Sequence, residues 1–367
     1  MNTKKMRYVW FLVILCIFCL TLFLARTRSK VEMRNRIYHQ WNEHFVVSKG
    51  KESYVRTTND SNQTVVLSEA QSYGMLITVA AAEKGQAQQA DFDRLYHYYL
   101  NHRLEGTQLM SWKQTISNGK AKDEDHNATD GDLYIAYALL KAAQKWPKQA
   151  KDYQAQAKAI LEDILAHNYN EETGVLTVGN WANQDSEFYH LMRTSDTLPA
   201  QFQIFYEVTK DSKWLAIKEK MLQQLQTISS QTKTGLLPDF IWVDEQGTRV
   251  ADPKTIESKY DGAYSYNACR LPYNLVQSKD KTSQQLVKKM LNFFKSQRNL
   301  YAGYDLKGKA LNNHQAASFL APIVYASEHE KGYLKLVQQN KYIFTQDLPL
   351  NNYYDATMTT MIALELF

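Results

Sequence analysis

Residues 133–140 read LYIAYALL, an apolar run that leaves almost no polar face when it is wound into a helix. A helix that is hydrophobic on every side needs protein on every side, as in the inner layer of a ring of helices. Apolar residues recur at three- and four-residue spacing through most of the chain, whereas alternation with period two is scarce. The pattern predicts an all-α fold with paired inner and outer layers. Helices are expected at 69–83, 90–101, 132–145, 148–167, 199–208, 212–231, 267–277, 282–297, 313–326, 328–340 and 354–366.

Three of these helices are preceded by capping-box patterns, Ser68-x-x-Gln71, Thr129-x-x-Asp132 and Thr282-x-x-Gln285. Polar and aromatic loops separate the helices, and such loops gather at one end of a helical barrel. We therefore expect any chemistry near the helix starts.

The composition describes a large soluble body attached to a basic N-terminus. The chain has 367 residues, 44% hydrophobic and 22% charged, so it can bury a large core. With only 14 Gly and 7 Pro, and no linker, residues 31–367 are expected to form one domain, active as a monomer. The net charge is +5, but eight Lys and Arg residues lie within the first 36 positions, so the body is nearly neutral. No Lys/Arg stripe is visible, which argues against nucleic acid as a partner.

Residues 8–25 form an uncharged apolar run between basic flanks. Such a helix is about 27 Å long, enough to cross the hydrocarbon core of a bilayer. A cleaved signal peptide is the alternative, but its apolar region usually has about 7–15 residues and ends in small side chains. Bulky Leu22, Phe23 and Leu24 precede Ala25 here. We expect residues 1–30 to be an uncleaved signal anchor in the cell membrane, with the body outside; a secreted protein is the alternative.

Two polar motifs precede expected inner helices. SEAQSYGM at 68–75 places Glu69 in the first turn of an apolar helix, where a carboxylate either complements the helix dipole or takes part in chemistry. DEDHNATDGD at 123–132 has six ionisable side chains, which form either a solvated acidic loop or part of a cleft. Its spacing matches neither a zinc tetrad nor a calcium loop, so we expect no metal and no cofactor.

A third motif, IESKYDGAYSYNACRLP at 256–272, mixes carboxylates, tyrosines and an arginine. It reads either as an aromatic loop packed on the body or as a second part of the same cleft. Together with the first two motifs, it resembles glycoside hydrolase family 8. The resemblance extends over nearly the whole body, because eight segments occur in the family's order: SEAQSYGMLITVA, FDRLYHYYLNH, LMSWK, NATDGDLYIAYALLKA, RTSDTLPAQFQIF, TGLLPDFI, YNACRLPYNL and NYYDATMTTM.

The resemblance implies an (α/α)6 barrel and inverting cleavage of β-linked polysaccharides. It places the general acid at Glu69 and a carboxylate that contacts sugar at the cleavage subsite at Asp130. Many members have an aspartate base where this chain has Asn267, an amide that cannot accept a proton from water. The chitosanase and lichenase branch, which has Asn there, uses a Glu ten residues earlier. That residue is Glu257, with Asp261 as the nearest alternative base.

Inverting hydrolysis needs an acid and a base on opposite faces of the sugar, about 6.5–9.5 Å apart. A helix N-terminus lowers the pKa of Glu69, so burial and the charge of Asp130 have to outweigh the dipole if Glu69 is to stay protonated. Aromatic rings can stack on sugars, and arginine can orient carboxylates or hydroxyls. The expected substrate-binding residues are Tyr73, Trp112, Trp181, Tyr266, Asn267, Arg270 and Tyr353.

We therefore predict a membrane-anchored, endo-acting, inverting glycoside hydrolase with a polysaccharide substrate. Chitosan, a β-1,3-1,4- or β-1,4-glucan, and the cell's own exopolysaccharide all remain open. The alternative is a catalytically weak polysaccharide-binding or exopolysaccharide-biosynthesis scaffold, because Asn267 replaces the usual base.

Overall fold

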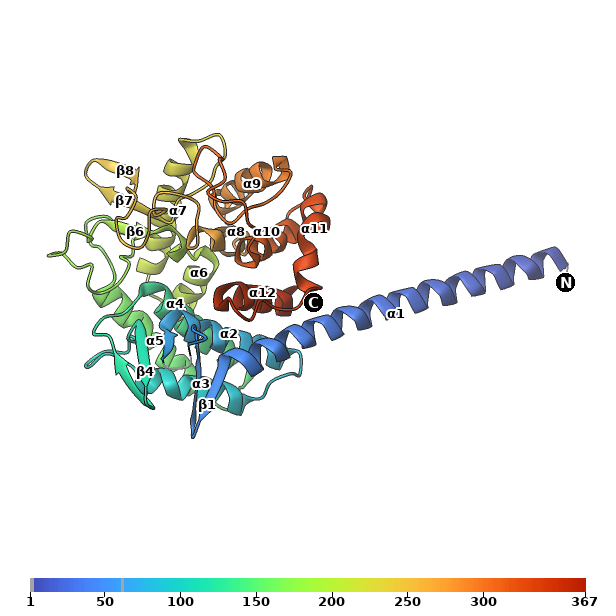
Figure 1. Cartoon of the computed structure of the whole chain (residues 1–367), viewed down its shortest axis with the longest axis horizontal. Coiled ribbons are helices and arrows are strands. Elements are labelled where there is room, and N and C mark those ends of the chain that lie inside the picture. Colours follow the sequence, from blue (N-terminus) through green and yellow to red (C-terminus); the bar gives the residue numbers. More distant parts are fainter. Residues whose placement is uncertain (1–2, 61–62) are drawn as a thin grey trace.

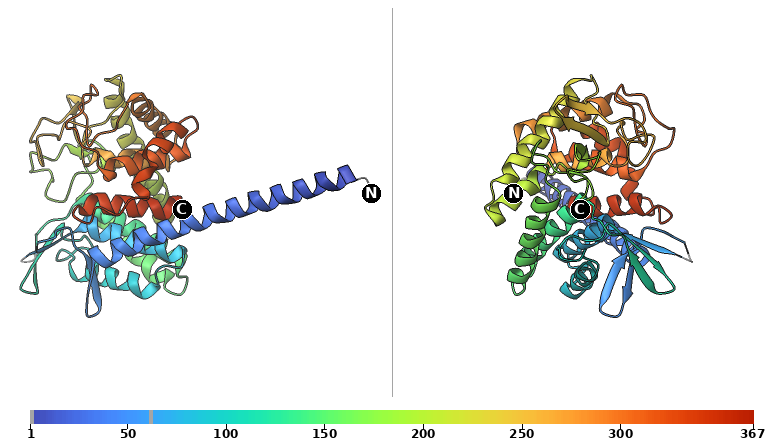
Figure 2. Two further views of the ribbon diagram at one scale, coloured as in Figure 1. Left: turned by 45° about the vertical axis from the view of Figure 1, so that its right-hand side comes forward. Right: turned by 90° about the vertical axis from the view of Figure 1, so that its left-hand side faces the viewer.

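The computed structural model describes residues 3–60 and 63–367, with the side chains of 3–5 and 9 outside that description. The first two residues of the predicted anchor also lie outside it. Six helices form an inner ring, and each packs against an outer helix (Figures 1 and 2). The inner helices are α2 (Ser68–Glu83), α4 (Thr129–Lys145), α6 (Pro199–Thr209), α8 (Leu271–Val276), α10 (Ala317–His329) and α12 (Tyr353–Leu366). Their outer partners are α3 (Gln89–Asn101), α5 (Ala150–His167), α7 (Lys213–Ser230), α9 (Lys281–Ser296), α11 (Leu334–Asn340) and the C-terminal part of α1 (Thr3–Phe45).

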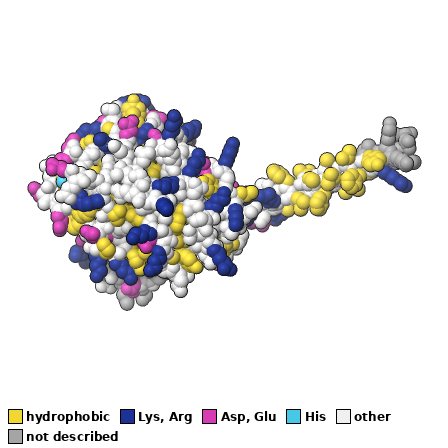
Figure 3. All heavy atoms as spheres, turned by 90° about the horizontal axis from the view of Figure 1, so that it is seen from above, with side chains coloured by type: hydrophobic (Ala, Val, Ile, Leu, Met, Phe, Trp, Pro, Cys, Tyr) yellow, Lys and Arg dark blue, Asp and Glu magenta, His cyan; other side chains and the backbone are white. Residues whose placement is uncertain are grey.

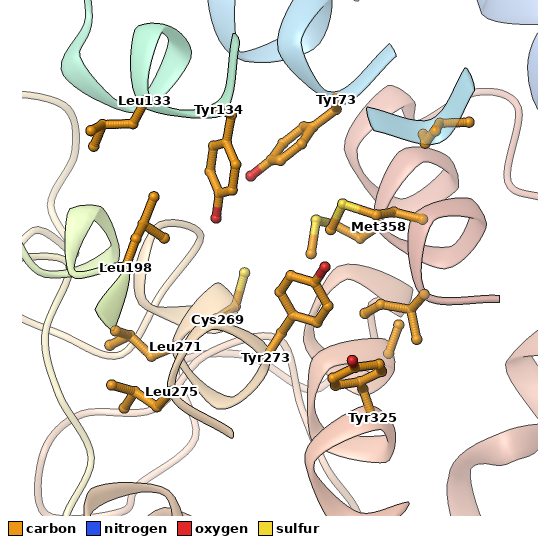
Figure 4. Packing of buried hydrophobic residues seen from close by; sticks show 14 of the residues in the cluster. Tyr73, Leu133, Tyr134, Leu198, Cys269, Leu271, Tyr273, Leu275, Tyr325 and Met358 are labelled. Carbon is orange, nitrogen blue, oxygen red and sulfur yellow. The ribbon is translucent and has the colours of Figure 1, made fainter. Parts of the chain in front are cut away.

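The apolar run in α4 belongs to the inner ring, as its sequence predicts. Tyr134 packs against Tyr73 of α2, with ring centroids 5.2 Å apart. Its hydroxyl donates to Asn274 Oδ1 at 3.0 Å, so the polar end of the ring is satisfied inside the core. Side chains from α2, α4, α8, α10 and α12 meet in the same region (Figure 4). Burial on all sides explains why these helices lack a polar face.

Three small antiparallel sheets, absent from the sequence prediction, brace the loops at one end of the barrel. Each strand has at most five residues, which is too short for period-two alternation to stand out. The sheets are β1 (Val46–Lys49) with β2 (Glu52–Val55); β3 (Thr64–Leu67), β4 (Lys113–Ser117) and β5 (Lys120–Asp123); and β6 (Leu191–Arg193), β7 (Phe240–Asp244) and β8 (Gly247–Val250). Leu67 at the end of β3 pairs with Lys113, which sets the entry into α2.

Helix α1 crosses the predicted boundary between anchor and body without a break. Its first part is exposed, but Ile37, Tyr38, Trp41 and Phe45 are buried in the core. Trp41 Nε1 donates to Thr357 Oγ1 of α12 at 2.9 Å. Residues 31–45 are thus the outer helix that pairs with α12, and no linker separates them from the apolar segment.

Some local predictions were wrong. The helix expected at 267–277 is divided into a 3-10 turn, Ala268–Arg270, and α8, while α10 and α11 begin later than expected, at Ala317 and Leu334. None of the three capping boxes forms, because Ser68 and Thr129 lie inside their helices. Thr129 Oγ1 donates instead to the Thr177 carbonyl, and α9 is capped by Asp280.

Trp41→Ala should destabilise the body by about 3–5 kcal/mol, the usual cost of removing a large buried aromatic side chain. Phe18→Ala is the matched control, because Phe18 is an exposed aromatic residue of the same helix. Chemical unfolding of the full-length protein in detergent measures both changes. Equal effects of the two substitutions would show that residues 31–45 do not belong to the barrel.

Candidate active site

The inner helices start at the end of the barrel that carries the small sheets (Figure 1). Glu69 is in the first turn of α2, Asp130 is in the first turn of α4, and Arg270 directly precedes α8. Loops that return from outer to inner helices surround these starts. The fold thereby gathers residues that are up to 201 positions apart in the chain.

Helices α2 and α4 approach each other unusually closely at their first turns. A Cβ atom at Gly131 would lie 2.2 Å from Ser68 Oγ and 3.0 Å from the Ser68 carbonyl carbon. Only glycine permits this contact. Glu69 follows Ser68 and Asp130 precedes Gly131, so this close contact holds both carboxyl groups next to the same guanidinium group.

That group belongs to Arg270, which is almost fully buried. Its Nη1 atom donates to Glu69 Oε2 at 2.6 Å and to Asp130 Oδ2 at 3.1 Å. Its Nη2 atom donates to Ser195 Oγ at 2.8 Å and to Asn267 Oδ1 at 3.0 Å. The rigid fork of donors fixes the relative positions of Glu69, Asp130 and Asn267.

A second buried guanidinium, on Arg193, lies on the other side of Asp130. Its Nη1 atom is 2.9 Å from Asp130 Oδ1 and 3.6 Å from Asp196 Oδ1, and its Nη2 atom is 3.6 Å from Glu257 Oε1. Neither carboxylate oxygen of Asp196 has a hydrogen-bond partner among the described residues. Arg193 and Asp196 were not identified as site residues from the sequence, although two charges in the buried segment RTSD are the signal that would have marked them.

Glu257 reaches the site from a loop. Its side chain is 46% exposed, and its Oε2 accepts a hydrogen bond from Asn267 Nδ2 at 2.8 Å. Asn267 in turn accepts from Arg270. The amide therefore links the Glu257 carboxylate to the guanidinium group that holds Glu69.

Two buried carboxylates hold the backbone of this loop. Asp261 accepts from the backbone N–H groups of residues 256, 257 and 258 at 2.7–3.1 Å, and is only 1% exposed. Asp239, which was not singled out from the sequence, accepts from the N–H groups of residues 265, 267 and 268 at 2.7–3.1 Å. Asp261 is thus enclosed and occupied by backbone donors, whereas Glu257 faces solvent.

The environment gives Glu69 and Asp130 opposite protonation preferences. Burial raises the pKa of Glu69 to about 7; Arg270 opposes this shift, while the negative charge of Asp130 adds to it. Burial by itself would also raise the pKa of Asp130, but Arg193 and Arg270 hold that pKa below its ordinary value. The carboxyl group of Glu69 and the carboxylate of Asp130 therefore share one guanidinium group, and burial outweighs the opposing charge of Arg270 at Glu69.

The predicted aromatic contacts fall into two groups. Tyr73 is fully buried and its hydroxyl accepts from Arg270, and Tyr353 is also buried, so neither ring offers a face to a sugar. Trp112 and Trp181 are partly exposed, and Tyr266 is 43% exposed. These three rings are available for stacking.

Trp112 and Trp181 belong to a longer row of partly exposed rings. Trp112 stacks on His126 with centroids 5.8 Å apart, and His126 meets Trp181 at 6.2 Å. Phe188 continues the row at 5.4 Å from Trp181, and Trp242 of β7 is 6.3 Å beyond it. The sequence analysis missed His126, Phe188 and Trp242, because only folding brings β7 beside the loop at 178–190.

Comparisons with known proteins identify this arrangement. The family Glycosyl hydrolases family 8 matches residues 13–365. A "Beta-glucanase" of Niallia circulans is 30% identical over 298 residues, covering 78% of this chain and 72% of that protein. "Endoglucanase A" of Acetivibrio thermocellus is 28% identical over 317 residues, covering 83% of this chain and 62% of that protein.

Solved structures show the same fold. The apo β-1,3-1,4-glucanase from Paenibacillus sp. X4 has a TM-score of 0.82 at 24% identity, covering 93% of this chain and 92% of that one. Rex8A from Paenibacillus barcinonensis, complexed with xylose, has a TM-score of 0.72 at 22% identity, covering 91% and 93%. At these identities the likeness concerns the fold alone. The family match, over nearly the whole chain, establishes that this protein belongs to glycosyl hydrolase family 8 and is a glycosidase.

Proposed function

We propose that this protein is an inverting, endo-acting hydrolase of a neutral β-linked glucan, with Glu69 as general acid and Glu257 as general base. The observation that carries the proposal is the contrast at Arg270, where Glu69 has a pKa of about 7 beside an ionised Asp130. A general acid works best when its pKa is near the working pH.

In the proposed reaction Glu69 gives its proton to the glycosidic oxygen as the bond from that oxygen to the anomeric carbon breaks. Glu257 removes a proton from water, whose oxygen forms the new bond on the opposite face of the sugar. Asp130 stays ionised between two guanidinium groups and accepts hydrogen bonds from sugar hydroxyls. Glu69 ends ionised and Glu257 protonated, and proton exchange with solvent restores both groups.

Asn267 supports the assignment of Glu257 as the base. Its Nδ2 donates to one oxygen of Glu257 and so orients the carboxylate. An aspartate at this position would remove that donor and place a like charge beside Glu257. Asp261, the alternative base, has its carboxylate occupied by three backbone N–H groups.

The aromatic rings beside the site and the relatives favour a neutral glucan. The row of rings from Trp112 to Trp242 suits the apolar faces of glucose units. The names of the relatives, "Beta-glucanase" and "Endoglucanase A", point the same way.

We also propose that residues 8–25 anchor the protein in a membrane with the barrel outside the cell. The helix that contains them is long and apolar enough to cross a bilayer, and its apolar segment is not buried against the body. The length and composition of this segment also suit a signal sequence, so the anchor needs its own test.

Glu69→Gln should lower turnover on lichenan by about 10²–10⁴, because the amide is nearly isosteric but cannot donate the acid proton. In the parent enzyme turnover should fall as the pH rises through about 7, where Glu69 loses its proton. Release of reducing sugar from lichenan, carboxymethylcellulose, xylan and chitosan measures both effects and the substrate preference. Turnover by Glu69→Gln within about twofold of the parent would remove Glu69 from the mechanism.

Glu257→Ala should be as inactive as the acid variant, and added azide should restore part of its cleavage by entering the space left by the carboxylate. Asp261→Ala is the matched control, because it removes a nearby carboxylate that holds backbone instead of facing solvent. Azide should not restore Asp261→Ala. Asn267→Asp should lower turnover, because it removes the donor to Glu257. Rescue of Asp261→Ala alone would make Asp261 the base.

The full-length protein should remain in the membrane fraction after salt washing, with its barrel open to protease added outside intact cells. Fractionation followed by N-terminal sequencing tests this expectation. A soluble protein that begins near Ala25 would identify a cleaved signal peptide instead.

A further inference from the structure

Helix α1 fixes how the barrel is oriented relative to its apolar segment. α1 and α12 run antiparallel, since Arg34 Nη1 donates to the Phe367 carbonyl at 3.0 Å while Phe45 packs against Tyr353 with centroids 5.8 Å apart. Tyr353 begins α12 at the active-site end, and Phe367 follows α12 at the opposite end. The apolar segment therefore leaves the barrel from the end opposite the active site (Figures 1 and 2).

The length of helix α1 also sets the distance between the barrel and the bilayer. At 1.5 Å per residue, Arg34 lies about 14 Å beyond Ala25 and Phe45 about 30 Å beyond it. The headgroup layer of a bilayer is roughly 5–8 Å thick on each side. With residues 8–25 in the hydrocarbon core, the far end of the barrel is within about one Debye length, about 8 Å, of the headgroups.

Five short connections lead from inner to outer helices at this far end, and each contains one lysine. None of these lysines forms an ion pair within the described part of the chain. The five residues, which we call the basal lysines, are Lys84, Lys148, Lys210, Lys279 and Lys331. Lys and Arg side chains are prominent on the part of the body from which α1 emerges (Figure 3).

The acidic residues of these connections and of the neighbouring helix end offset the lysines only in part. Glu83 pairs with Lys141, and Glu330 pairs with Lys288, at 3.3 and 3.4 Å. Asp211 accepts from the Lys213 N–H, and Asp280 caps α9. An accepted N–H bond leaves a carboxylate charged, so Asp211 and Asp280 offset two of the five lysines. Five lysines against two carboxylates without a cationic partner among the described residues leave these connections positive.

We propose that the basal lysines dock the far end of the barrel on anionic lipid headgroups, so that the active-site mouth points away from the bilayer. The inference rests on the proposed anchor and adds an interaction surface to it. Anionic lipid surfaces attract each nearby lysine. The contact holds the mouth about 30 Å above the hydrocarbon core, where it meets polymer outside the membrane instead of lipid headgroups.

The test uses the full-length protein reconstituted in vesicles, with Cys16→Ala and Cys19→Ala to remove the exposed thiols. A fluorophore is attached to Gln144→Cys, near the end of α4 at the basal face, or to Glu245→Cys, in the turn between β7 and β8. Both positions are exposed. Lipids with a nitroxide on the headgroup quench the fluorophore at short range, in vesicles of phosphatidylcholine alone or with about 30% phosphatidylglycerol.

Quenching should be at least about twofold stronger at position 144 than at 245, and should increase when phosphatidylglycerol is present. About 1 M salt should remove that increase, because the Debye length falls to about 3 Å. Exchange of the five basal lysines for glutamine should also remove the increase in quenching that phosphatidylglycerol causes. The matched control exchanges five exposed lysines elsewhere on the body and should leave it intact: Lys51, Lys120, Lys122, Lys307 and Lys309.

Equal quenching at the two positions would overturn the orientation. An anionic-lipid effect that survives either salt or the basal exchange would overturn the docking surface. The salt titration keeps all five basal lysines, so it decides the point even if the five-lysine variant fails to fold. Hydrolysis of lichenan and membrane fractionation are measured separately. Loss of hydrolysis with unchanged quenching would count against the proposed function alone. Loss of membrane attachment would count against the anchor and, with it, against the docking surface.

Discussion

The site depends on the hydrogen bonds that the buried guanidinium group of Arg270 donates. This group joins Glu69 from α2, Asp130 from α4 and Asn267 from the loop that carries Glu257. A buried arginine is tolerable only when its donors are satisfied, and removing one partner leaves an uncompensated charge. The same contact that places the proposed acid and the proposed base thus also holds the starts of three barrel segments together.

The site contains more negative than positive groups. Glu69, Asp130, Asp196 and Glu257 surround only Arg193 and Arg270. Burial makes the surplus charge costly, and the pKa of both Glu69 and Asp196 rises to about 7 as a result. The protonation that a general acid requires is therefore a property of the whole group. Asp130 stays ionised because it alone contacts both guanidinium groups closely.

Most helices of the fold and the main residues of the site could be predicted from the sequence. The helical periodicity gave most helix positions, and the family resemblance gave the barrel and led to Glu69, Asp130, Glu257 and Arg270, which the fold does bring together. The parts that escaped prediction depend on contacts between distant segments. Asp239 and Asp261 hold loop backbone, the short strands carry too little periodicity, and the outer-helix role of residues 31–45 depends on packing against α12. The basal lysines are scattered in the sequence and gather only in the fold.

The central claim is that Glu69 is held as a carboxylic acid near neutral pH, and infrared difference titration of the full-length protein measures it directly. Subtracting the Glu69→Gln titration from that of the parent isolates the carboxyl band of this residue. The account predicts that the band disappears around pH 7, because burial raises the pKa of Glu69 despite the contact with Arg270. A carboxyl band lost below about pH 5, near the ordinary glutamate value, would contradict it.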